Sequence, residues 1–179
     1  MKRYLVNVII ENKPYVNDPE GETILKDLIA GRDYQSVKSV RTAKMLNIII
    51  ETNLHPHPDG AYGFRVEIGN NVITYITDIE HPPGNPLMEV SNLARNSDLL
   101  IHEAHFTPTD LPNFKNWGHS SWEEAVGVAK AADAKQLVLY HHSPFYDDKQ
   151  IDQIEIDAKK AFSQTVAARE SLTINIPAI

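Results

Sequence analysis

Apolar and polar positions alternate in short runs along this chain, and stretches with helical spacing separate the runs. Residues 2–11 alternate and predict a strand, and 37–51 predict a second strand. Between them, the apolar positions of 22–30 have helical spacing, after a turn-rich segment at 12–21. The chain is therefore expected to open with a β-α-β unit.

The remaining pattern alternates strands and helices. Gly69-Asn70-Asn71, between alternating runs at 63–68 and 72–76, predicts a hairpin. The later elements are expected to be a helix at 87–96, a strand at 98–103, a helix at 121–132, a strand at 136–141, a helix at 148–162 and a strand at 165–176. This order predicts an α/β fold with a mixed sheet.

Composition narrows the class of protein. With 42% hydrophobic residues in 179, the chain can bury a core, and without cysteine any metal would be held by His and carboxylate. A net charge of -7 without a basic stripe predicts no nucleic-acid patch. No apolar leader or 18-residue apolar run is found, so we expect a cytoplasmic protein without membrane contact.

Charge and proline usage change near residue 54. Nearly all of the acidic excess lies after residue 53, and a proline-punctuated link follows at 54–60. The sequence therefore predicts two parts, a β-α-β unit over 1–53 and a second part over 54–179.

Polar side chains gather where the apolar runs of the second part end. Asp78 follows one predicted strand, His102-Glu103 ends the next, and His141 ends a third. His119 precedes a helix whose first residues, Ser120 and Ser121, can form a capping box with a later Glu. Imidazoles and carboxylates at strand ends indicate a metal or acid–base site.

These residues carry a resemblance to a known family. The segments are Thr77-Asp78, His102-Glu103-Ala104, Gly118-His119-Ser120-Ser121 and His141-His142-Ser143. With them, residues 54–179 resemble the C-terminal half of a metallo-β-lactamase-fold hydrolase, of the ribonuclease Z-like and cyclic-phosphodiesterase-like branch. The resemblance implies half of an αββα sandwich and a phosphodiester or similar small-molecule ester substrate.

The resemblance also assigns roles to single residues. It implies that His57, ahead of Gly63-Phe64-Arg65, and the strand-end residues Asp78 and His141 are ligands of Zn²⁺ or Mn²⁺. It gives His119 a leaving-group or transition-state role, supported by His102 and Glu103. The remaining histidines are interpreted as loop, surface or supporting residues: His55, His81, His105 and His142.

One family motif is missing. Such hydrolases carry an earlier His-x-His-x-Asp-His cluster, and no His precedes residue 54. His55-Pro-His57-Pro-Asp59 imitates the start of that cluster, but Gly60 stands where the last His belongs. We therefore expect an incomplete site, and with it a chain that is inactive alone.

The first part resembles a different family. The segments Val6–Lys13, Asn17–Ile24 and Val40–Lys44 are similar to the PurS small subunit of phosphoribosylformylglycinamidine synthase, a non-catalytic bridging subunit of purine synthesis. One alternative function is thus a non-enzymatic interaction module, and another is an inactive chimera of two half-domains. Half a sandwich leaves apolar sheet surface uncovered, so we also expect a homo-oligomer.

Overall fold

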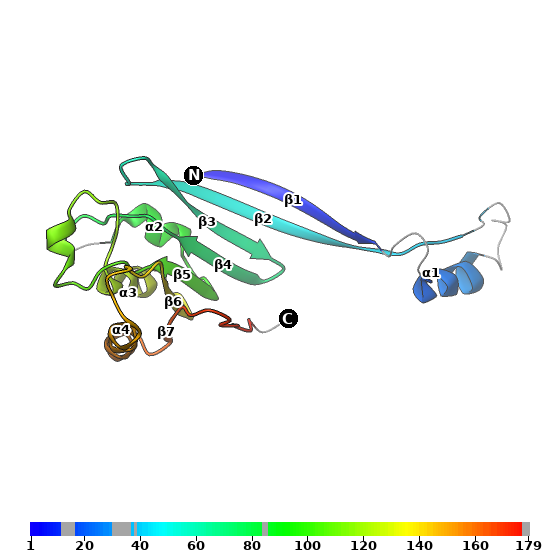
Figure 1. Ribbon diagram of the computed structural model, residues 1–179. Coiled ribbons are helices and arrows are strands. Elements are labelled where there is room, and N and C mark those ends of the chain that lie inside the picture. Colours follow the sequence, from blue (N-terminus) through cyan, green and yellow to red (C-terminus); the bar gives the residue numbers. More distant parts are fainter. Residues whose placement is uncertain (12–16, 30–36, 38, 84–85, 177–179) are drawn as a thin grey trace. The chain divides into compact units, whose positions relative to one another are not determined.

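The computed structural model describes residues 1–11, 17–29, 37, 39–83 and 86–176 (Figure 1). Within these residues seven strands form one sheet in the order β1-β2-β3-β4-β5-β6-β7. The strands are β1 (Lys2–Glu11), β2 (Ala43–His55), β3 (Ala61–Ile68), β4 (Asn71–Ile76), β5 (Leu99–Glu103), β6 (Leu137–Tyr140) and β7 (Thr165–Ala167). The helices are α1 (Pro19–Ile24), the π-helical η1 (Leu25–Ile29), α2 (Met88–Leu93), the 3₁₀ turn η2 (Leu111–Phe114), α3 (Trp122–Ala131) and α4 (Asp148–Ala161).

The chain divides into two compact units, one formed by Val6–Ile48 and the other by Met1–Leu5 with Ile49–Ile179. In the smaller unit, Asp18 caps α1 by accepting from Gly21 N at 3.0 Å, and it also accepts from Thr42 N at 2.7 Å. Those backbone donors, Thr42 first, lower the pKa of Asp18. Asp18 is thus the N-cap residue that precedes α1.

Several expectations for this unit need correction. The second strand begins at Ala43 rather than at 37, because Asp18 takes the amide of Thr42. It also runs to His55, into the predicted link, and the helix begins at Pro19. Parts of the predicted turn, helix and strand, at 12–16, 30 and 38, lie outside the described residues.

The larger unit carries the mixed sheet that the pattern predicts. β3 and β4 are antiparallel and joined by Gly69-Asn70, where Gly69 has φ +61°. β4, β5, β6 and β7 are parallel to one another. The α/β fold class is confirmed, with differences at element ends. The last strand stops at Ala167, because Leu172 N then bonds Arg169 O in a turn.

Among the described residues of the larger unit, helices cover one face of this sheet and not the other. Ile76, Leu100 and Leu139 are buried in one core with the apolar sides of α2, α3 and α4. The opposite face carries residues paired across β3, β4, β5 and β6, namely Phe64, Tyr75, Ile101 and Val138. On it Tyr62 is 49% and Phe64 39% exposed.

Capping boxes begin the two longer helices. Ser121 caps α3 with Glu124, as predicted, and Asp147 caps α4 with Gln150. Ser121 thereby fixes the start of the helix that follows His119. Within the described residues, no helix combines the length and apolarity that a membrane crossing requires.

Candidate metal centre

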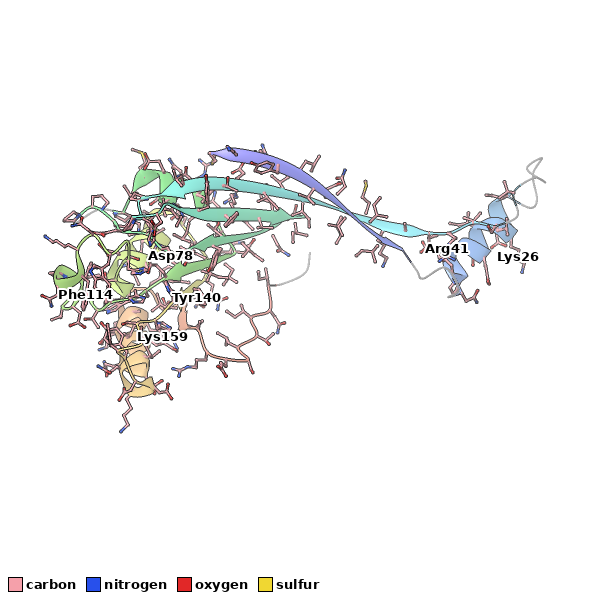
Figure 2. All side chains as sticks on the ribbon, turned by 45° about the horizontal axis from the view of Figure 1, so that its top comes forward. Lys26, Arg41, Asp78, Phe114, Tyr140 and Lys159 are labelled. Atoms are coloured by element: carbon pink, nitrogen blue, oxygen red, sulfur yellow. The ribbon has the colours of Figure 1, made fainter. Side chains whose placement is uncertain are left out.

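The polar residues of the sequence pattern meet at one edge of the sheet. Asp78 follows β4 (Figure 2), Glu103 ends β5, and His141 follows β6. The three strands are parallel and adjacent, so their carboxyl ends lie at the same edge.

Two of these residues have an uncommon backbone. Asp78 has φ +53° and His141 has φ +56°, in the left-handed region that non-glycine residues seldom adopt. Such conformations persist where the surrounding structure enforces them, and they gather at functional sites. Here each one turns the chain directly after a strand.

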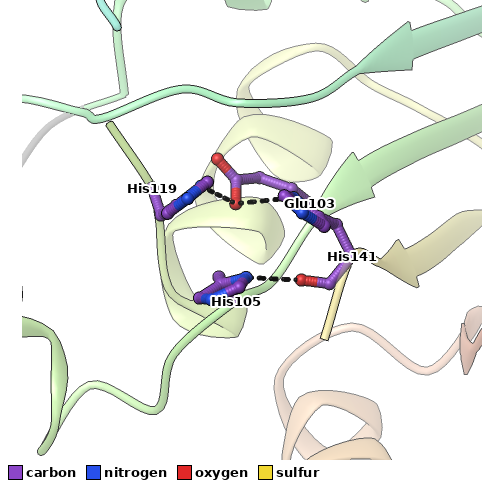
Figure 3. A group of neighbouring side chains, drawn as sticks. All are labelled: Glu103, His105, His119 and His141. Atoms are coloured by element: carbon purple, nitrogen blue, oxygen red, sulfur yellow. Dashed lines mark hydrogen bonds and ion pairs between the residues drawn. The ribbon is translucent and has the colours of Figure 1, made fainter. Parts of the chain in front are cut away.

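Glu103 is the most enclosed member of the cluster and is fully buried. Its Oε1 accepts from Ile79 N at 2.6 Å, and its Oε2 accepts from His119 Nδ1 at 3.2 Å (Figure 3). His141 Nδ1 lies 3.7 Å from the same Oε2. Burial alone would raise the pKa of Glu103, but these three donors outweigh it and lower that pKa. The carboxyl group is therefore an anion that binds the Asp78 turn to two histidines.

Asp78 faces the same histidines. Its Oδ1 lies 3.5 Å from His141 Nδ1 and 3.9 Å from His119 Nδ1. His57, Asp78 and His119 offer ligand atoms that all lie within 4.8 Å of one another. The three ligands implied by the family resemblance, His57, Asp78 and His141, are thus gathered around His119.

Gly118 makes the approach of His57 to His119 possible. Gly118 has φ +82°, and a Cβ atom there would overlap the ring of His57. The carboxylate of Glu80 accepts from Asn116 N at 3.0 Å and from Gly118 N at 3.1 Å. This anchors the loop that carries His119.

His105 joins the cluster although the sequence reading left it as a loop residue. It does lie in the loop after β5, and Glu103, His105, His119 and His141 also offer ligand atoms within 4.8 Å of one another. His105 is brought into the cluster by a β-bridge between Phe106 and Ser121. Because this bridge joins segments that are distant in the sequence, no local sequence pattern indicates it.

His102 points away from the cluster, so it is not placed to touch a bound ion. Its Nδ1 donates to Glu103 O at 2.7 Å, and its Nε2 lies 3.3 Å from His81 Nε2. His81 Nδ1 accepts from Leu87 N at 3.3 Å. Burial lowers the pKa of both rings, and that of His81 to about 3.

The donor set fits a divalent cation. His141 Nδ1 is buried and has no hydrogen-bond partner among the described residues. The Glu103 carboxylate, whose Oε2 lies 3.7 Å from His141 Nδ1, raises the pKa of His141 ahead of the opposing effect of burial. Imidazole nitrogens with carboxylate oxygens are the ligands that zinc and manganese accept.

A groove of about 710 Å³ opens beside the cluster. Its lining includes Pro56, His57, Pro58, Glu80, Pro82 and Gly118. His57 is the member of the ligand cluster that borders it. A substrate in the groove would therefore approach the cluster from the His57 side.

Two protein families match the chain. The family described as Beta-lactamase superfamily domain matches residues 34–142, and the family described as Phosphoribosylformylglycinamidine (FGAM) synthase, PurS, matches residues 5–57. The two matches overlap, so the boundary near residue 54 stays a prediction.

Curated relatives are ribonucleases. The chain is 36% identical to ribonuclease Z of Pediococcus pentosaceus over 106 residues, which are 59% of this chain and 33% of that protein. It is 37% identical to ribonuclease Z of Bacillus subtilis over 89 residues, 50% of this chain and 29% of that protein. The chain thus spans about a third of the length of these relatives.

Solved structures agree with the fold. The metallo-beta-lactamase fold protein YhfI from Bacillus subtilis has a TM-score of 0.58 and 27% identity, covering 68% of this chain and 47% of that one. Human tRNase Z, short form, has a TM-score of 0.57 and 25% identity, covering 73% and 44%. With a family match over more than half of its residues, this chain belongs to the beta-lactamase superfamily.

Proposed function

We propose that this chain is the C-terminal, metal-binding part of a hydrolase that cleaves phosphodiester bonds in RNA. The observation that carries the proposal is the Glu103–His119 pair, bonded at 3.2 Å beside the group formed by His57, Asp78 and His119. A buried carboxylate hydrogen-bonded to an imidazole, next to a cation site, provides the acid–base and metal groups that hydrolysis of a phosphoryl group uses.

In this proposal His57, Asp78 and His141 would hold the metal. When bound, divalent cations would supply Lewis acidity and lower the pKa of a water molecule toward 7. Three protein ligands are few for two cations, and the family motif that provides the others is missing before residue 54. The full activity is therefore proposed to need ligands from outside the chain described.

His119 is proposed to give a proton to the leaving oxygen. Its Nδ1 hydrogen is donated to Glu103, which leaves Nε2 as the ring atom that can face a substrate. The Glu103 carboxylate orients the ring through this hydrogen bond, as the acid does in other His–carboxylate pairs.

The substrate class comes from the relatives. They are named ribonuclease Z and tRNase Z, which favours RNA over the absence of a nucleic-acid partner that the charge predicts. The net charge of -7 does not oppose this, because a phosphate bound in a metal site needs no cluster of Lys and Arg.

The test is hydrolysis of a short fluorescent RNA with added Zn²⁺ or Mn²⁺. Glu103→Gln keeps an acceptor for Ile79 N but removes the charge behind His119, and we expect a rate loss of about 100-fold, with a similar loss for His119→Ala. Glu123→Gln, at an exposed position in the first turn of α3, is the matched control and should keep the rate. Equal rates for Glu103→Gln and Glu123→Gln would contradict the proposal.

The second candidate is a non-catalytic interaction module, which the PurS match over residues 5–57 favours. The zinc content of the purified chain separates the two candidates. Loss of zinc in His141→Ala supports the hydrolase, whereas no zinc in either protein favours the module.

We also propose that the chain self-associates through the sheet face that carries Phe64 and Tyr75. This face is apolar, and no Lys or Arg side chain lies on it between β3 and β6. Glu103 shares this face at the end of β5, but its carboxylate is already fully buried, so a second copy can cover the face without burying a further charge.

A further inference from the structure

The cluster contains a second set of donors besides the three ligands that the family resemblance implies. We propose that Glu103, His105, His119 and His141 together bind one zinc ion. This site needs no residue from outside the chain, because all four donors lie between residues 103 and 141.

Three imidazole rings surround one small space. The ring centroids lie 4.3 Å apart for His105 and His119, 4.9 Å for His105 and His141, and 5.1 Å for His119 and His141. The rings of His105 and His119 are stacked at an angle of 18°, so one of them must turn about its side-chain bonds for both to coordinate the same ion. The fully buried Glu103 carboxylate lies beside them, with Oε2 at 3.2 Å from His119 and 3.7 Å from His141 (Figure 3). Three nitrogens and one oxygen are the number and the kind of ligands that tetrahedral zinc takes.

The hydrogen bonds of His105 leave it ready to coordinate. Its Nδ1 donates to the carbonyl oxygen of His141 at 2.9 Å, so Nε2 is the ring atom with a free lone pair. Histidines that bind metals typically donate their other ring N–H to a carbonyl or carboxylate in this way.

Main-chain bonds hold His105 on both sides. Phe106 N donates to Ser120 O at 3.1 Å, which keeps the His105 loop against the His119 segment. Ser143 N donates to His105 O at 3.2 Å, which keeps it against the His141 segment. The three rings are therefore close before any ion arrives, and binding requires little ordering of the loops.

The unpartnered nitrogen of the cluster is a second, independent observation. His141 Nδ1 is buried without a hydrogen-bond partner in the described part of the chain, and leaving a buried polar atom unsatisfied costs about 1–3 kcal/mol. A zinc ion among the four donors would give this nitrogen its partner.

Four protein ligands would close the site. Closed zinc sites are structural, whereas catalytic ones keep a position for water. Because His119 would be a ligand, zinc at this site would also engage the imidazole that the proposed hydrolysis uses. This site thus differs from the metal site of the proposed hydrolase in its ligands, and zinc bound here would occupy His119 instead of leaving it free to act on a substrate.

The experiment is a titration of the chelator-treated chain with Zn²⁺ against a fluorescent zinc indicator, with Co²⁺ absorption to report four-coordinate geometry. His105→Gln is the decisive variant, since a Gln amide can still donate to the His141 carbonyl. We expect one zinc per chain, and affinity at least about tenfold weaker in His105→Gln. Glu123→Gln, at an exposed position in the first turn of α3, is the control and should bind zinc as the natural chain does. His57→Ala, which removes a ring from the other donor group, is measured alongside.

Equal affinity of His105→Gln and the natural chain would overturn the inference, as would the absence of zinc binding. Loss of affinity in His57→Ala with none in His105→Gln would place the ion with Asp78 instead. That last result would leave the proposed hydrolase standing, so the two proposals can fail separately.

Discussion

Asp78 and His141 both have backbone angles in the left-handed region. Asp78 lies two residues beyond the end of β4, and His141 directly follows the end of β6. This region costs most L-residues about 1–2 kcal/mol, but Asn and Asp adopt it more readily. Asp at position 78 therefore meets a backbone requirement as well as offering a ligand.

Asp78→Ala and Asp78→Asn should separate these two needs. Both remove the carboxylate and should weaken metal binding. In the metal-free protein, Asp78→Ala should lower the free energy of unfolding by about 1 kcal/mol more than Asp78→Asn. Urea denaturation with a chelator present measures this, and equal stability of the two variants would argue against the backbone effect.

His81 predicts how stability depends on pH. Burial, with a smaller contribution from the neighbouring His102, lowers the pKa of His81 to about 3, against 6.5 for an ordinary His. Below pH 6.5 the unfolded chain therefore binds a proton that the folded chain excludes. The free energy of unfolding should therefore decrease as the pH is lowered from about 6.5 to 3. For this group the decrease is up to about 1.4 kcal/mol per pH unit.

The variant His81→Gln tests the assignment, because Gln can accept from Leu87 N and donate to His102 without titrating. Urea unfolding of both proteins between pH 7 and pH 5 should give a flatter curve for His81→Gln. Parallel curves would show that His81 is not the group responsible.

At the scale of elements, local signals were sufficient where the deciding contacts are local. Gly69-Asn70 between alternating runs predicted the hairpin, and Ser121 with Glu124 predicted the start of α3. The start of β2 was not predictable in this way, since Thr42 bonds to Asp18, which lies 24 residues earlier. The end of β7 likewise depends on a turn at Arg169 that the apolar pattern did not indicate.

The two capping boxes predict different consequences for the two helices. Ser121→Ala and Asp147→Ala should each lower the free energy of unfolding by about 1 kcal/mol, because each leaves a helix N–H without its acceptor. Ser121→Ala should also weaken zinc binding, since Ser121 lies only two residues after His119. Asp147→Ala, at the start of α4, should not. Thermal melts with zinc titration measure both, and equal effects on zinc affinity would contradict this.

At the scale of the molecule, α2, α3 and α4 pack on one face of the sheet in the larger unit, where Ile76 and Leu100 are fully buried. On the opposite face Tyr62 and Phe64 are well exposed, although Val138 is buried. The sequence predicted this imbalance, because residues 54–179 resemble half of a two-sheet sandwich. It did not predict His105, because the Phe106–Ser121 bridge that positions it joins segments distant in the sequence.

Phe64→Lys should therefore reduce self-association. The substitution places a charge in the middle of the apolar face, and covering it would bury that charge. Phe145→Lys is the matched control, because Phe145 is 69% exposed in the loop after β6 and lies outside the strands. Size-exclusion chromatography with light scattering should show smaller species for Phe64→Lys alone. A monomer for the natural chain at micromolar concentration would dismiss the proposed association.

The bonds that place His105 against its neighbours join backbone atoms, from Phe106 to Ser120 and from Ser143 to His105. Side chains at positions 105 and 141 can therefore be exchanged while the loops keep their course. Introducing cysteine at these two positions should shift the metal preference of the site from borderline ions such as Zn²⁺ to softer ions such as Cu(I). The edge of this sheet is thus a backbone scaffold on which the metal ligands can be replaced by other side chains.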